Sequence, residues 1–157
     1  YRACADGDPG AVEAWGQTLY AGRESRELRA EERNRARALN SLLRDLGIDQ
    51  ANDWEPVLAH CQAAGFAFAA VHWRIGLHDC LLGYAWAWLE NQIGAAVKLV
   101  PLGQTDGQRL QLRLAERLPE AVQHALLVED GDIGAGAPAL AIASARHETQ
   151  YTRLFRS

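Results

Sequence analysis

Residues 79–101 read DCLLGYAWAWLENQIGAAVKLVP, and this stretch decides the fold class. Between positions 80 and 100 it carries only two charges, Glu90 and Lys98. A helix of that length extends about 30 Å at ~1.5 Å per residue, which spans a small domain. Because the stretch is apolar nearly all round, we expect it to be buried nearly all round. A membrane span needs ~20 apolar residues, but Glu90-Asn91-Gln92 lies at the middle, where lipid penalises polar groups most. The stretch therefore predicts an all-α, single-domain helical bundle built around a long buried central helix, about 79–100.

Two lines of side chains run along this predicted helix. The bulky packing face consists of Leu81, Ala85, Trp88, Gln92, Ala96 and Leu99. The second line consists of small residues that end at a lysine: Gly83, Ala87, Gly94 and Lys98. Small-residue spacing lets another backbone approach closely. It serves either tight packing within the fold or a groove for a partner.

Composition limits the class of protein. The chain has 157 residues, of which 48% are hydrophobic, enough for one domain with a real core over residues 1–157. The net charge of −4 gives no electrostatic support for nucleic-acid binding. Cys4, Cys61 and Cys80 are odd in number and widely spaced, which favours a reducing compartment over a disulfide framework. The chain begins at Tyr1 and contains no methionine, so we infer that an N-terminal segment is missing.

Local signals predict the remaining helices. Their starts and ends are read from caps, prolines and glycines. The expected helices run from Pro9 to about Tyr20, from Ser25 to Leu46, from Asp53 to Gly65, from Phe66 to near Gly76, from the Thr105/Gln108 capping box, from Pro119 to Leu127, and from Pro138 onward.

The Ser25–Leu46 helix is expected to face inward through Leu28, Leu39, Leu42 and Leu46. Glu32 and Arg35 fall on the same face by 3.6-residue spacing. These two charges can pair with each other, meet a partner, or extend past the leucines into solvent.

No catalytic or metal motif is complete. His147-Glu148 begins like the zinc motif HExxH, but Tyr151 occupies the second histidine position. Neither a GxSxG elbow nor a phosphate-binding loop is present. Cys80, His78 and His72 lack paired ligand spacing. We therefore predict no catalytic residue, no metal ligand and no cofactor.

The C-terminal end carries residue types that anchor interfaces. It combines arginines with aromatic and apolar side chains: Arg146, His147, Tyr151, Arg153, Leu154, Phe155 and Arg156. We predict that residues 151–157 form a partner-binding tail. The alternative is a tail folded back on its own domain.

Three segments closely resemble the urease accessory protein UreF family: ESRELRAEER, LENQIGAAVKLVPLGQTDGQRL and PALAIASARHETQYTRLFRS. The similarity runs from about Glu24 to Ser157. The family's N-terminal segment, usually with a Gly/Phe/Ser-containing motif, is not found in this chain.

The resemblance implies an all-α, dimeric, cytoplasmic chaperone without catalysis of its own. Such proteins bind UreD (also called UreH), and the pair recruits the GTPase UreG to deliver nickel to apo-urease. Carried onto this chain, the C-terminal residues above would bind partners, and Lys98 with the 101–107 turn, including Gln104 and Asp106, would face the GTPase. A scaffold, a regulator of UreG GTP hydrolysis and a nickel-binding carrier are the competing functions.

Overall fold

In the computed structural model, which describes residues 1–134 and 136–151, the chain folds as helices joined by turns. The all-α prediction is confirmed, and no strand occurs within those residues. The α-helices are α1 (Arg2–Ala5), α2 (Pro9–Ala21), α3 (Arg26–Asp45), α4 (Gln50–Asp53), α5 (Glu55–Leu58), α6 (Gln62–His72), α7 (Leu77–Leu99), α8 (Gln104–Ala115), α9 (Leu118–Leu126) and α10 (Pro138–Glu148), with a 3-10 helix, η1 (Asp130–Asp132).

Backbone contacts group these helices into two compact units. Unit 1 comprises residues 1–71 and 134–157, of which 135 and 152–157 lie outside the described part, and unit 2 comprises residues 72–133. The predicted single-domain organisation stays a prediction. No helix in the described part of the chain is both long and apolar enough to cross a membrane.

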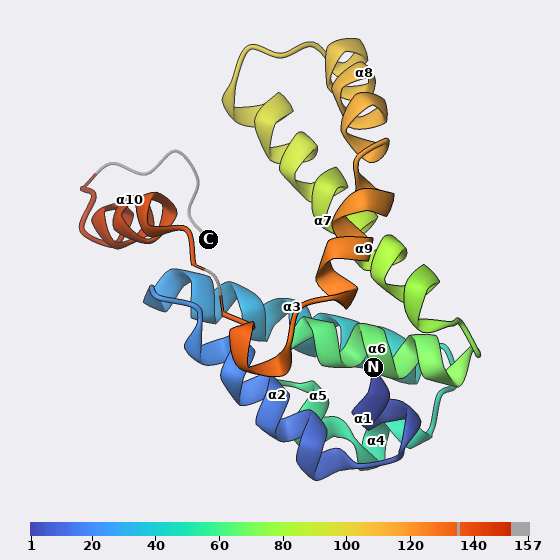
Figure 1. The fold of residues 1–157 in the computed structure, drawn as a ribbon. Helices are drawn as coiled ribbons and strands as arrows, with labels where there is room; N and C mark the ends of the chain where they lie inside the picture. Colours follow the sequence, from blue (N-terminus) through green and yellow to red (C-terminus); the bar gives the residue numbers. More distant parts are fainter. Residues whose placement is uncertain (135, 152–157) are drawn as a thin grey trace. The chain divides into compact units, whose positions relative to one another are not determined.

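Unit 1 holds the main apolar core, around which α2, α3, α5 and α6 gather (Figure 1). The ring of Trp54 packs against that of Phe68, with centroids 5.4 Å apart. The core consists of Cys4, Val12, Leu43, Ile48, Ala51, Val57, Leu58, Ala67, Phe68 and Ala69. Four of these ten residues are alanine or cysteine, which lets the helices approach one another closely at those points.

Unit 2 is an antiparallel hairpin of α7 and α8, with α9 packed on α7 (Figure 1). The two helices pack tightly at Gly107 on α8. A Cβ atom placed there would lie 2.6 Å from Cγ2 of Val97 and 3.6 Å from Cγ2 of Ile93. Gly94, in the predicted small-residue line on α7, does not make this approach, since nothing lies within 4 Å of a Cβ placed there.

The long helix has the predicted length but not the predicted burial. Along α7 the buried residues are Cys80, Leu89 and Ile93. Trp88 and Leu99, assigned to the packing face, are 57% and 60% exposed. The expectation of burial nearly all round was wrong, because α8 and α9 pack along a stripe of α7 instead of enclosing it.

The inward face of α3 agrees with the predicted one only in part, since Leu39 packs against the core as expected but other predicted positions do not. Leu42 and Leu46 are more than half exposed, whereas Ala36, Asn40 and Leu43 are buried. Gly47 has φ of +81° and ends the helix as predicted.

Several helix boundaries differ from the predictions, among them those near Gly65 and at the start of α8. Gly65 lies inside α6, where a Cβ would sit 3.1 Å from Cδ2 of Leu39. Close packing on α3, not helix termination, therefore explains this glycine. The helix after the 101–103 turn starts at Gln104, and the Thr105/Gln108 capping box is not formed, because Gly103 is the N-cap and no side chain caps it.

Candidate functional site

The predicted C-terminal site begins in α10. Pro138 starts this helix at a position where its missing N–H is not needed, and Thr149 caps its end. Arg146 is exposed, His147 is half-buried, and Tyr151 is fully exposed. The remaining tail residues of the prediction, Arg153, Leu154, Phe155 and Arg156, lie outside the described residues.

The end of α10 makes polar contacts with the first turn of α3. Ser144 Oγ lies 2.6 Å from Ser25 Oγ. Glu148 Oε1 accepts hydrogen bonds from the backbone N–H groups of Arg26 and Glu27. His147 Nδ1 lies 2.6 Å from Glu27 Oε2. His147, predicted to bind a partner, is thus engaged within the chain in this conformation.

The second predicted group surrounds the α7–α8 turn in unit 2. Lys98 is exposed in the last turn of α7, where a positive charge complements the helix dipole. Gln104 is the first residue of α8 and is exposed. Asp106 is exposed and pairs with Arg109 at 3.1 Å. This group therefore belongs to a different unit from the α10 group.

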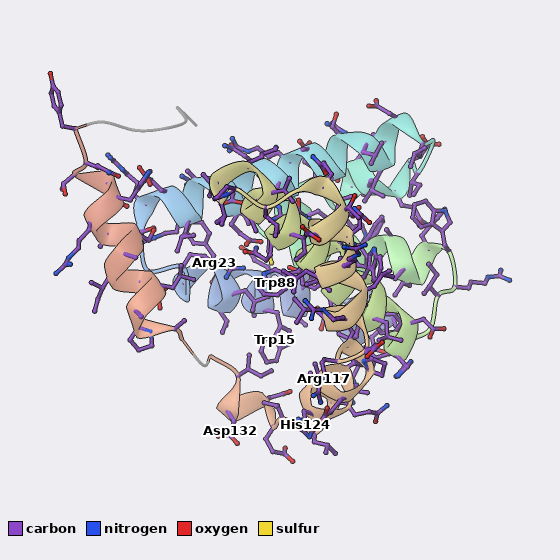
Figure 2. All side chains as sticks on the ribbon, turned by 90° about the horizontal axis from the view of Figure 1, so that it is seen from above. Trp15, Arg23, Trp88, Arg117, His124 and Asp132 are labelled. Carbon is purple, nitrogen blue, oxygen red and sulfur yellow. The ribbon has the colours of Figure 1, made fainter. Side chains whose placement is uncertain are left out.

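Sequence reasoning missed a buried charge network in unit 1. Arg23, in the α2–α3 turn (Figure 2), donates from Nε and Nη2 to Glu32 Oε2 at 3.0 and 2.8 Å. Glu32 Oε1 accepts from the backbone N–H of Gln62, at the start of α6, at 2.8 Å. Glu32 therefore pairs within the unit, whereas Arg35 pairs with Glu31 at 3.6 Å. Of the three alternatives left open by the sequence, pairing between Glu32 and Arg35 is therefore not what the structure shows.

Large apolar side chains are exposed along unit 2. Figure 2 labels Trp88 on α7 and His124 on α9, two of the helices of unit 2. The most exposed of these residues are Trp88, Leu99, Val100, Leu112 and Leu127.

The thiols are poorly suited to nucleophilic or metal chemistry. All three cysteines are buried and free. Burial raises the pKa of the Cys61 thiol, and the Glu32 carboxylate raises it further. Burial also raises the pKa of the Cys80 thiol. Among the described residues, no group of three or more His, Cys, Asp or Glu side chains could hold a metal ion.

These features define an all-α protein with large apolar side chains exposed on the helices of unit 2. The UreF family model matches residues 1–115. The whole chain aligns with the urease accessory protein UreF of Alcanivorax borkumensis at 50% identity, covering 71% of that relative. It aligns with the UreF proteins of Klebsiella pneumoniae subsp. pneumoniae and Pseudomonas putida W619 at 48% and 50% identity, covering 70% of each. The chain belongs to the UreF family of urease accessory proteins.

Proposed function

We propose that this chain is a scaffold for urease maturation. It binds UreD (UreH) and the GTPase UreG, forms a homodimer, and supports nickel insertion into apo-urease in the cytoplasm without catalysis of its own. The observation that carries the proposal is the alignment of the entire chain with UreF proteins at about half identity. The scaffold role fits the surface location of Arg146 and of the apolar side chains of unit 2.

Truncation tests whether the C-terminal end binds UreD. We expect a chain ending at Gln150, without residues 151–157, to lose UreD in a pull-down. Its helical content should persist in circular dichroism, because α10 ends at Glu148. Arg146→Ala in the full chain should weaken the same capture, since arginine is a common interface anchor. Exposed Arg113→Ala on α8 is the matched control. Undiminished capture by the truncated chain would contradict the tail assignment.

Regulation of GTP hydrolysis is a second candidate role, favoured by the exposed Lys98 beside the α7–α8 turn. A cation supplied in trans can stabilise charge on a transferring phosphoryl group, and an arginine doing so is worth ~10³–10⁵ in rate. GTP turnover by UreG is measured with the wild-type chain, with Lys98→Ala and with Arg113→Ala. A rate that this chain does not change would leave the scaffold role alone.

A nickel carrier is the alternative function. The described residues bring no three candidate ligands together, so we assign nickel handling to the assembled complex. Equilibrium dialysis of the isolated chain against Ni²⁺ tests this assignment. Retention of one equivalent per chain would favour the carrier instead.

A further inference from the structure

The helix α3 carries a line of arginines along one face. Arg29, Arg33 and Arg37 lie four positions apart, which places them on successive turns, and we call these three residues the arginine ridge. Arg29 and Arg37 are exposed, and Arg33 is partly exposed. The ridge extends about 12 Å along the helix at ~1.5 Å per residue.

The ridge lacks the alternation of charge that stabilises a solvated helix. Such helices place carboxylates three or four positions from their basic residues, where opposite charges attract. Arg33 instead has arginines at both positions four residues away, and Ala30 and Ala36 at the positions three residues away. Like charges at this spacing repel each other and destabilise the helix. The repulsion is relieved when an anion binds across the ridge.

Two of the guanidinium groups are oriented by neutral groups. Nη2 of Arg29 donates to the backbone carbonyl oxygen of Glu24 at 3.2 Å. The guanidinium carbon of Arg33 lies 5.5 Å from the ring centroid of Tyr20 on α2. A carbonyl group and an aromatic ring hold a cation in place without cancelling its charge. These side chains therefore lose less conformational freedom when an anion binds to them.

The carboxylates of α3 nearest the ridge are engaged elsewhere. Glu32 accepts from Arg23 and from the backbone N–H of Gln62. Glu31 pairs with Arg35. Within the described residues, no carboxylate lies within ion-pair distance of a ridge arginine. The charges of the ridge are therefore available to a ligand.

We propose that the arginine ridge is a docking surface for an acidic helix of a partner protein. Glutamates four positions apart on such a helix repeat about every 6 Å, which matches the spacing of the ridge. Each guanidinium can donate two parallel hydrogen bonds to one carboxylate. A nucleic-acid backbone fits less well, because the chain carries a net charge of −4 and repels a long polyanion. This inference does not rest on the proposed scaffold function.

The test is an NMR titration of the full chain, labelled with ¹⁵N, using a synthetic alanine-based peptide with glutamate at every fourth position. We expect the α3 amide signals and the Nε–Hε signals of the ridge to shift. Raising the salt concentration from about 20 to about 200 mM should weaken binding, because salt screens exposed charges. Arg33→Gln should raise the dissociation constant about threefold to fivefold, as for the loss of one exposed ion pair. Arg113→Gln, at an exposed arginine on α8, is the matched control and should leave the dissociation constant unchanged.

Three further ligands separate recognition of an acidic helix from other ways of binding anions. The same peptide with glutamine in place of glutamate should cause no shift at the ridge. Free glutamate at an equal carboxylate concentration should shift the ridge signals less than the peptide, because its carboxylates are not linked at the matching spacing. A single-stranded oligonucleotide should bind more weakly than the acidic peptide. Equal shifts with free glutamate, tighter binding of the oligonucleotide, or unshifted α3 signals with the acidic peptide would each overturn the proposal.

Discussion

The buried carboxylate of Glu32 is the most informative single position for the stability of unit 1. Its side chain is 8% exposed and joins two elements that are distant in sequence. One oxygen accepts from the guanidinium of Arg23 before α3, and the other accepts from the amide of Gln62 at the start of α6. Glu32→Ala removes both links without adding bulk.

The expected cost of Glu32→Ala follows from these two links. Leaving the Gln62 N–H without its acceptor costs about 1–1.5 kcal/mol. Losing the charge-assisted bonds to Arg23 costs about 1.5 kcal/mol after allowance for solvent, because the Arg23 side chain is 42% exposed. The free energy of unfolding should fall by about 3 kcal/mol, which lowers the melting temperature by roughly 6–12 °C at 2–4 °C per kcal/mol.

The assay is urea unfolding followed by circular dichroism and tryptophan fluorescence. Glu31→Ala is the matched control, because the neighbouring carboxylate is 61% exposed and only pairs with Arg35 on the surface. It should change the free energy of unfolding by less than about 0.5 kcal/mol. A double-mutant cycle with Arg23→Ala should give a coupling energy of about 1–2 kcal/mol. A loss below about 1 kcal/mol for Glu32→Ala at unchanged m-value would refute the reasoning.

Three further predictions concern packing, thiol chemistry and capping. Gly107→Ala should destabilise the chain by about 1 kcal/mol in thermal unfolding, because its Cβ would overlap stiff Val97, and helix propensity offsets only part of that cost. In the native chain, Cys61 and Cys80 should alkylate more slowly than a free cysteine at pH 8, since their raised pKa leaves less thiolate. Their alkylation rates should rise as the pH increases, and should equal that of a free cysteine only after unfolding in urea. Asp8→Ala should cost about 1 kcal/mol through loss of the α2 N-cap, whereas Asp8→Asn should cost little.

The ends of most helices could be predicted from the sequence, because the interactions that set them are local. Asp8 caps α2 three residues on, Gly47 ends α3 with a positive φ, and Pro138 starts α10. Each signal acts within about one helical turn and does not depend on the rest of the fold. The all-α class and the span of α7 follow from the same local information.

Which face of each helix is buried was decided by the tertiary structure. Leucines at 42 and 46 seemed the obvious core of α3, yet Ala36 and Leu43 are buried instead. The sequence of α3 is compatible with either rotation, and the choice depends on packing against α4 and α5. Along α7, apolar composition indicated enclosure, but two helices cover only a stripe of it.

For the candidate site too, the sequence determined one part and the tertiary structure determined the other. The sequence by itself identified the family and the arginine-rich C-terminal end, since residue types and motifs are read directly from it. It could not pair Glu32 with Arg23, nor place Glu148 on the first turn of α3. A charged side chain takes whichever partner the fold brings within hydrogen-bond distance, and for Glu148 that partner lies 122 positions away.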